Sequence, residues 1–316
     1  MSNIRDVAKL SGHSVSTVSR VINHKSYVAK QTKQEILAAM KELNYYPNDI
    51  ARALSTGKTY RVGVVMPYSN HPYFQKLVSA ITQAAFKEDY QVTLLPSHYD
   101  VDSEIRCLEM LKHQAFDGLI FTSRAISFKK IQEYQVYGPI TCCEDTLEYP
   151  ISCAYTNRKI SYINGFKYLK KLNFQHIGVT ISRNEQTSRS AKLTVDSYHD
   201  VFQQEIPESL LVRDMQFFED GIKAAKLLTK NNPQLDAIFA NGDQVAAGII
   251  YQLKKSQIDI PVIGQENMDY SFLMDFSTID HKLSEIGEYA FWALFEKKVV
   301  KKMIPSEFIT RGLLKK

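Results

Sequence analysis

The chain has 316 residues, of which 44% are hydrophobic and 23% are charged, and its net charge is +5. These values fit a globular protein of two or three domains and exclude a low-complexity chain. Residues 1–60 hold nine Lys and Arg against four Asp and Glu, whereas the rest of the chain holds 30 of each sign. The positive excess therefore lies at the N-terminus, as in a nucleic-acid-binding segment or a solvated basic surface.

Targeting and cysteine patterns point to the cytoplasm. The opening MSNIRDVAKL lacks the apolar core of a signal peptide, and no stretch approaches the roughly 20 apolar residues of a membrane helix. Four cysteines lack C-x-x-C spacing and nearby paired histidines: Cys107, Cys142, Cys143 and Cys153. We expect reduced thiols in a cytoplasmic protein, with no metal site and no membrane contact.

Residues 3–44 show helical periodicity only. Asn3 and Asp6 have the spacing of a capping box at the start of a first helix, and Gly12 ends that helix. Ser14 can cap a second helix, and Asn44 can adopt the left-handed conformation after a third. We therefore expect an all-α domain over residues 1–46.

The segment IRDVAKLSGHSVSTVSRVIN fits a helix-turn-helix. Ala8 is small where the two helices cross, Gly12 supplies a positive φ in the turn, and Val18 faces inward. The alternative is an unrelated small helical bundle. The spacing of all three residues, together with the basic charge, favours the helix-turn-helix.

The outward side of the second helix would then contact DNA. Val15 suits a thymine methyl group, and Arg20 suits guanine or a phosphate. Hydroxyls there can bond base edges or phosphates, but they can equally cap the helix. The predicted contacts of this helix are Val15, Ser16, Thr17, Ser19, Arg20 and Asn23.

Residues 47–59 interrupt the pattern as a linker that orders on binding, and from Arg61 apolar runs alternate with amphipathic helical stretches. This alternation predicts doubly wound parallel sheets in residues 60–316. One sheet should end near Glu144 and a second should begin near His176, giving two lobes. The expected strands are Val62–Met66, Val92–Leu95, Gly118–Phe121, Ile140–Cys143, Ile177–Thr180, Ala237–Ala240 and Pro261–Ile263.

Polar and aromatic residues follow these strands, where doubly wound folds hold ligands. Carboxylates can accept hydrogen bonds from sugar hydroxyls, and aromatic faces can stack on a sugar ring. The alternative for such residues is a structural role, because an Asp after a strand often caps the next helix. The acidic set favours a neutral polyol, a mono- or oligosaccharide. The predicted ligand contacts are Tyr73, Phe74, Arg124, Glu144, Lys192, Phe217, Asp243 and Glu266.

Several motifs together resemble the lac/gal repressor family of bacterial regulators. They are DVAKLSGHSVSTVSRVIN, YV, LAAMKELNYYPN and ARALSTGKT, then GVVMPYSNHPYF, DGLIF, AIFANGD, AAG and VIG. The resemblance implies a helix-turn-helix followed by a sensor like the periplasmic binding proteins, acting as a homodimer on operator DNA without a cofactor. It also implies a hinge helix over Pro47–Ser55 whose DNA contacts are Asn48, Ala51 and Leu54, the last a minor-groove wedge.

The sequence departs from the family pattern in the sensor. Glu144 stands where the family has an acidic inducer contact, and Glu266 stands where it has a sugar-bonding Asp. Gly242 replaces the usual Asn, and Thr194 replaces an effector-binding Arg, for which Arg189 or Lys192 could substitute. The pattern contains none of the common catalytic motifs, so a sugar-active enzyme is disfavoured. The missing export signal and the DNA-binding segment likewise disfavour a sugar-binding protein, whereas a family member controlled by a corepressor or partner protein stays open.

Overall fold

The computed structural model describes residues 2–22, 28–46 and 57–312. The chain divides into two compact units, Met1–Tyr60 and Arg61–Lys316. Among the described residues, no helix is long and apolar enough to cross a membrane. Four of the predicted DNA contacts lie outside the described residues: Asn23, Asn48, Ala51 and Leu54.

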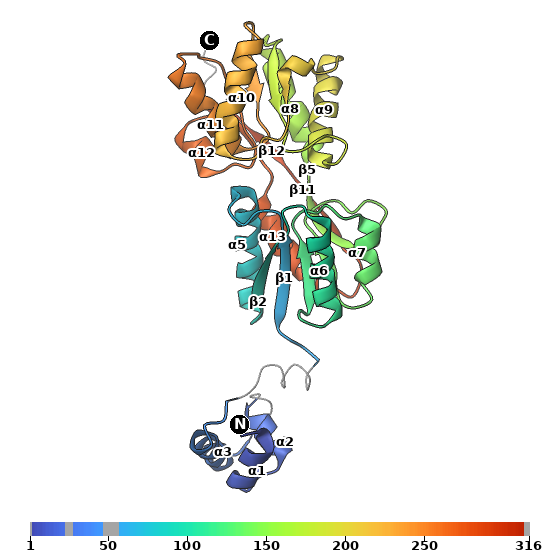
Figure 1. Ribbon diagram of the computed structural model, residues 1–316, viewed down its shortest axis with the longest axis vertical. Helices are drawn as coiled ribbons and strands as arrows, with labels where there is room; N and C mark the ends of the chain where they lie inside the picture. Colours follow the sequence, from blue (N-terminus) through green and yellow to red (C-terminus); the bar gives the residue numbers. More distant parts are fainter. Residues whose placement is uncertain (1, 23–27, 47–56, 313–316) are drawn as a thin grey trace. The chain divides into compact units, whose positions relative to one another are not determined.

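The described part of the first unit contains three helices, drawn in blue in Figure 1: α1 (Ile4–Ser11), α2 (Val15–Ile22) and α3 (Lys30–Glu42). The predicted capping box is present, because the Asn3 side chain accepts from the first-turn amides and the Asp6 carboxylate accepts from the Asn3 N–H at 2.8 Å. A small apolar core holds the helices together: Val7, Ala8, Val18, Val21, Ile36 and Ala39.

The turn between α1 and α2 has the predicted geometry. Gly12 has a φ of +70°, which a residue with a Cβ adopts only under strain, and its N–H donates to the Ala8 carbonyl. Val18 is completely buried at the helix crossing. Ser14 caps α2, since its Oγ accepts the Thr17 N–H at 3.1 Å. The unit is therefore the helix-turn-helix that the sequence predicts.

The second unit contains two α/β lobes. The first has six parallel strands in the order β11-β5-β4-β3-β1-β2. In Figure 1, α5 (Pro72–Lys87) and α13 (Leu283–Trp292) lie on one side of this sheet, and α6 (Val101–Lys112) and α7 (Phe128–Tyr134) lie on the other. Its strands are β1 (Arg61–Met66), β2 (Gln91–Pro96), β3 (Gly118–Phe121), β4 (Ile140–Cys142), β5 (Ser152–Asn157) and β11 (Lys301–Pro305).

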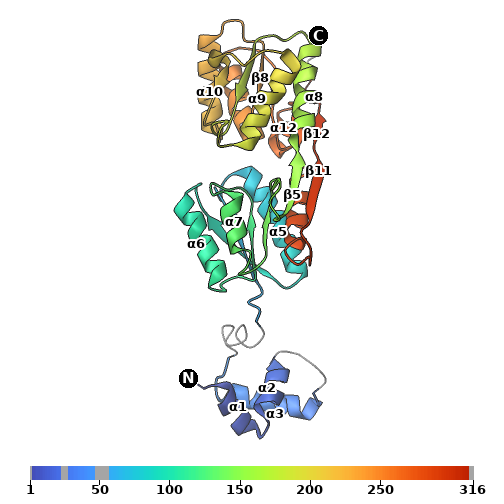
Figure 2. The same cartoon turned by 90° about the vertical axis from the view of Figure 1, so that its right-hand side faces the viewer.

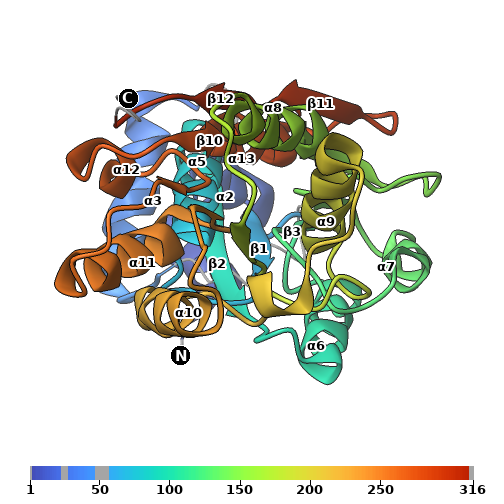
Figure 3. The same cartoon turned by 90° about the horizontal axis from the view of Figure 1, so that it is seen from above.

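The second lobe has four parallel strands in the order β7-β6-β8-β9. They are β6 (Ile177–Thr180), β7 (Leu211–Val212), β8 (Ala237–Phe239) and β9 (Val262–Ile263). Seen from above in Figure 3, α10 (Phe218–Asn231) and α11 (Asp243–Lys255) lie side by side, apart from the pair α8 (Arg158–Lys171) and α9 (Arg189–Phe202). The two lobes with parallel sheets confirm the predicted fold class.

Strands β5 and β11 differ from the expectation that the first sheet ends near Glu144. Figure 2 shows them side by side where the lobes connect, β5 leading directly into α8 of the second lobe. Their sequences, SCAYTN and KKMIP, contain no continuous apolar run. They escape prediction because long-range pairing at the sheet edge stabilises them, rather than local pattern. After β11, β12 (Glu307–Ile309) pairs antiparallel with β10 (Thr278–Asp280).

A buried carboxylate organises the loops of the second lobe. Asp243, at the start of α11, is completely buried and accepts hydrogen bonds from the Met268 N–H at 2.7 Å and the Thr278 hydroxyl at 2.6 Å. Met268 precedes the short helix α12 (Asp269–Leu273). A Cβ on Gly264 would lie 2.2 Å from the Asp243 Oδ1, so this position requires glycine. Burial raises the pKa of Asp243 to about 7, although both hydrogen bonds oppose the shift.

The raised pKa of Asp243 predicts a pH dependence of stability. Between about pH 4 and about pH 7 the unfolded chain has released this proton while the folded chain keeps it, so stability falls as pH rises. Asp243→Asn removes the titrating group. Measured between pH 5 and pH 8, the melting temperature of the wild type minus that of the variant should decrease with pH. A constant difference would show that Asp243 is ionised in the folded protein.

Candidate functional site

A cavity of about 380 Å³ lies between the two lobes of the second unit. Residues that follow β3 and β4 line it from the first lobe, residues at the end of β5 and the start of α8 line it where the lobes connect, and residues that follow β6, β8 and β9 line it from the second. The carboxyl ends of both parallel sheets therefore face this space, the position at which doubly wound folds bind ligands. Its volume is within the range of about 300–1,000 Å³ that is typical of small-molecule pockets.

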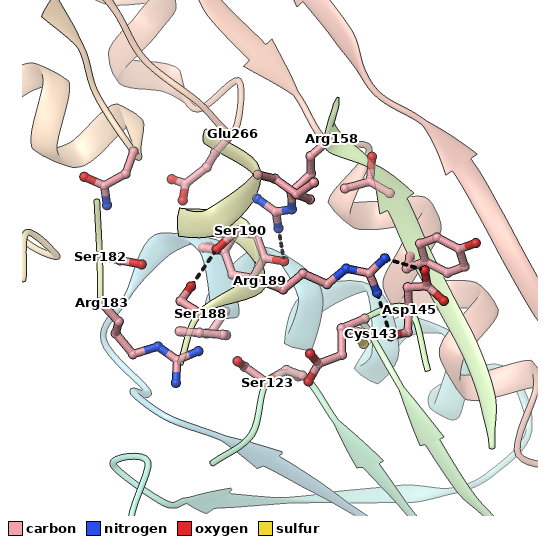
Figure 4. Close-up of a pocket in the computed structure, with 18 of the residues that line it drawn as sticks. Ser123, Cys143, Asp145, Arg158, Ser182, Arg183, Ser188, Arg189, Ser190 and Glu266 are labelled. Carbon is pink, nitrogen blue, oxygen red and sulfur yellow. Dashed lines mark hydrogen bonds and ion pairs between the residues drawn. The ribbon is translucent and has the colours of Figure 1, made fainter. Parts of the chain in front are cut away.

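Four of the predicted ligand contacts are part of the cavity wall: Tyr73, Phe74, Glu144 and Glu266. The rings of Tyr73 and Phe74 meet edge to face, with their centroids 5.0 Å apart. Glu144 follows β4 in the first lobe and Glu266 follows β9 in the second, and Figure 4 shows Glu266 among the side chains that line the cavity. These four side chains, which the sequence analysis selected because they follow strands, thus lie around one cavity.

Arg124 and Phe217 are absent from the wall but contact residues that form it. The Arg124 guanidinium lies 3.5 Å from the centre of the Phe128 ring, and its Nε lies 3.2 Å from Glu144 Oε1. It therefore supports Glu144 from behind. The Phe217 ring lies 5.7 Å from that of His71, a residue of the cavity wall in the other lobe.

Lys192 and Asp243 point away from the cavity, contrary to the expectation from sequence. The Lys192 ammonium pairs with Asp196 one turn further along the exposed side of α9, at 3.3 Å. The Asp243 carboxylate is turned into the second lobe, where it holds the Met268 amide and the Thr278 hydroxyl. Asp243 therefore has a structural role at the start of the next helix, which is close to the alternative that the sequence analysis gave for an Asp after a strand.

The sequence did not single out three side chains of the wall: Tyr99, Arg158 and Arg183. Arg158 opens α8 directly after β5, so it was missed with that strand. Its Nη2 donates to the Tyr73 hydroxyl at 2.8 Å and its Nη1 lies 3.2 Å from His281 Nε2. Arg183 follows β6 and lies over the Tyr99 ring, 3.8 Å from its centroid. The rule that residues after strands bind ligands was the signal available for Arg183.

Glu266 is held in an unusual position beside a glycine. It is 5% exposed with a φ of +103°, and a Cβ on Gly242 would lie 3.3 Å from its Oε1. The missing side chain at residue 242 therefore leaves room for a carboxyl group one methylene longer than Asp. Its Oε2 is buried and has no hydrogen-bond partner in the described part of the chain. Burial raises the pKa of Glu266 well above its usual value.

Several contacts connect the lobes around the cavity. Arg189 in the second lobe pairs with Asp145 in the first at 2.8 Å, as the dashed lines in Figure 4 show. The Lys76 ammonium donates to the Asn267 carbonyl at 3.1 Å. Arg189, which the sequence offered as a substitute for a missing arginine, thus lines the cavity already paired. Any ligand that enters must fit between these contacts or rearrange them.

The predicted DNA-contacting side of α2 is open to solvent. Val15 is 42% exposed, and Ser16 and Arg20 are also exposed, while Thr17 and Ser19 are half-buried. The Ser14 Oγ lies 2.7 Å from the Ser16 Oγ and 2.8 Å from the Thr17 Oγ1. These two hydroxyls therefore take part in capping the helix, the alternative that the sequence left open.

Comparisons with known proteins match both units. Residues 3–48 match the family of bacterial regulatory proteins, lacI family, and residues 59–286 match periplasmic binding proteins and sugar binding domain of LacI family. Catabolite control protein B of Bacillus subtilis (strain 168) is 40% identical over 291 residues, which cover 92% of this chain and 93% of that protein.

Solved structures show the same fold. The lac repressor dimer bound to operator and the anti-inducer ONPF aligns with a TM-score of 0.81, 23% identity and 98% coverage of each chain. A complex of the transcriptional regulator CelR with cellobiose aligns with a TM-score of 0.69 and 19% identity, over 98% of this chain and 99% of that one. With its helix-turn-helix and two-lobed effector-binding domain, the chain belongs to the LacI family of DNA-binding transcriptional regulators, which are not enzymes.

Proposed function

We propose that this regulator represses transcription by binding a pseudo-palindromic operator as a homodimer, under the control of a small-molecule effector. The observation that carries the proposal is the exposed side of α2 on a three-helix unit that holds the whole positive excess of the chain. One helix-turn-helix reads one half-site, so a pseudo-palindromic site requires two copies. The lac repressor relative is a dimer on its operator.

The DNA contacts that we propose on α2 are Val15, Ser16, Thr17, Ser19 and Arg20, with Asn23 directly after it. Arg20 has the most discriminating chemistry, because a guanidinium bonded to both guanine acceptors contributes about 1–3 kcal/mol of preference over a wrong base. We propose residues 47–59 as the hinge, with Asn48, Ala51 and Leu54 contacting the operator centre, from sequence alone.

Replacing Arg20 tests base reading against phosphate binding. We expect Arg20→Ala to weaken the preference for operator over random duplex by about 10-fold or more, since a bidentate contact is lost. Arg20→Lys is the matched control, because it keeps the charge and loses the fork geometry. Salt-matched gel shifts on both duplexes measure the two affinities. Equal losses on operator and random DNA would make Arg20 a phosphate contact.

Leu54→Ala tests the wedge at the operator centre. An apolar side chain inserted between base pairs bends the duplex, and only the operator complex gains the contacts that the bend permits. Operator binding should therefore weaken much more than non-specific binding in the same gel shifts. A loss of the same size on every duplex would contradict the wedge.

We propose a sugar, a mono- or oligosaccharide, as the effector in the cavity. The wall offers carboxyl, amide and hydroxyl groups for sugar hydroxyls, from Glu266, Asn241 and the serines in Figure 4, and aromatic rings from Tyr73, Phe74 and Tyr99. The solved CelR relative holds cellobiose. Arg124, Lys192, Phe217 and Asp243 lie outside the wall, so we propose no direct ligand contact for them.

Control by a corepressor or partner protein is the competing hypothesis, and a cavity-filling variant separates the two. Ser182 lines the cavity, so Ser182→Phe should block a small molecule while leaving the protein able to bind operator. A sugar panel should raise the melting temperature of the wild type by mass action and leave that of this variant unchanged.

Ser209→Phe, at an exposed serine of the short turn Glu208–Leu210, is the matched control and should respond like the wild type. A panel that shifts no melting temperature, in a protein whose operator binding responds to a purified partner, would favour the competing hypothesis.

A further inference from the structure

The charges of the cavity wall are unevenly paired. Four basic side chains line it (Arg158, Lys159, Arg183 and Arg189) against three acidic ones (Glu144, Asp145 and Glu266). Arg189 pairs with Asp145 at 2.8 Å, and Lys159 pairs with Asp200, outside the wall, at 2.9 Å. Arg124 approaches Glu144 from behind at 3.2 Å. In each of these contacts one positive charge is paired with one negative charge. Lys159, Arg189, Glu144 and Asp145 are therefore already neutralised by a partner.

Two guanidinium groups remain without a carboxylate. Within the described ranges, neither Arg158 nor Arg183 has an acidic oxygen within 4.0 Å. Arg158 contacts the Tyr73 hydroxyl and His281, and burial lowers the pKa of His281 well below its usual value, so both partners are neutral. Glu266 approaches neither of them within 4.0 Å, and burial raises the pKa of its carboxyl well above the usual value, which disfavours the charged form. The wall therefore holds two guanidinium groups that no ion pair within the described residues neutralises.

Arg183 lies among groups that suit an anion. Figure 4 shows Arg183 on the same side of the cavity as Ser182 and Ser188, with Ser190 above them. Ser188 is the N-cap of α9, and no hydrogen bond recorded for the described residues uses the amide N–H of Arg189 or Ser190. The positive end of a 14-residue helix thus faces the cavity beside an unpaired guanidinium.

Glu266 provides a second, independent group that lacks a partner. Glu266 lines the cavity, its Oε2 is buried without a partner, and Figure 4 places the residue with Arg158, away from Arg183. A buried carboxyl group without a partner, on a wall that also holds Asn241, suits the hydroxyl groups of a polyol. The cavity therefore offers hydroxyl partners in one part and anion partners in another.

We propose that the effector is a phosphorylated sugar whose phosphate lies against Arg183, Ser182 and the start of α9, and whose hydroxyls face Glu266. A phosphate monoester carries a charge of about −1.5 to −2 at pH 7, close to the excess of two guanidinium groups. The neutral sugar expected from sequence rested on counting acidic residues without Arg158 and Arg183. The proposal rests on the assignment of the cavity as the effector site.

Calorimetric titration of the full-length protein tests the proposal with matched ligands. The probes are hexoses and pentoses, their monophosphates, the corresponding sugar acids, and inorganic phosphate alone. We expect at least one monophosphate to bind roughly 10-fold or more tightly than its parent sugar, because charge-assisted hydrogen bonds to the phosphate are added. Inorganic phosphate alone should bind more weakly than that monophosphate.

Variants assign the effect to Arg183. Arg183→Gln should reduce the advantage of the monophosphate over its parent sugar to about twofold or less, and Arg183→Lys should restore part of it. Arg106→Gln, at an exposed position of α6, is the matched control and should behave as the wild type. The ligand-free melting temperature and operator affinity of each variant show that it is folded.

The outcomes separate this proposal from the function on which it rests. Equal or tighter binding of neutral sugars or of sugar acids overturns the phosphate assignment and keeps the cavity as the effector site. An unchanged monophosphate affinity in Arg183→Gln overturns the placement of the phosphate. Binding of no sugar of any kind overturns both the phosphate and the assignment of the cavity.

Discussion

The second unit depends on one geometric constraint: the parallel strands of both its sheets end at the same space. Side chains after β3 and β4 therefore meet side chains after β6, β8 and β9, although they are far apart in sequence. Charged groups brought together in this way lose solvent and need partners, and the cavity wall supplies acidic partners for Arg189 and not for Arg183. The guanidinium of Arg183, which has no ion pair among the described residues, supports our proposal that the cavity is a ligand site.

The same geometry offers a route from ligand binding to regulation. The contact of Arg189 with Asp145 and that of Lys76 with Asn267 both join the two lobes, and Arg183 reaches across to Tyr99. A ligand that occupies the cavity competes with some of these contacts and replaces others. The ligand therefore shifts the equilibrium between lobe arrangements, and the size of the shift equals the difference between its affinities for those arrangements.

Local pattern was sufficient to predict much of the architecture. The limits of β3 and β6 agree with the apolar runs Gly118–Phe121 and Ile177–Thr180, because both strands are buried on both faces and read as continuous apolar segments. The capping box at Asn3 and the positive φ of Gly12 are likewise local properties. Strands β5 and β11 could not be predicted this way, since their sequences are mixed and their pairing joins residues about 150 positions apart in sequence.

Residues of the site could be predicted only where the end of the preceding strand could be predicted. Tyr73, Phe74, Glu144 and Glu266 were placed correctly in the cavity wall, whereas Arg158 was lost with β5. Asp243 obeys the same strand-end rule but turns inward, because Gly264 leaves space for its carboxylate beside Met268 and Thr278. Which of two directions a side chain takes after a strand depends on packing that is absent from the sequence pattern.

The central claim is that the cavity and the DNA-binding unit are thermodynamically coupled. The most direct test is to measure operator affinity with and without a saturating cavity ligand, and ligand affinity with and without saturating operator. The account predicts that each changes the other by the same factor, within about 5- to 150-fold, as linkage requires. A ligand that occupies the cavity and leaves operator affinity unchanged would contradict it.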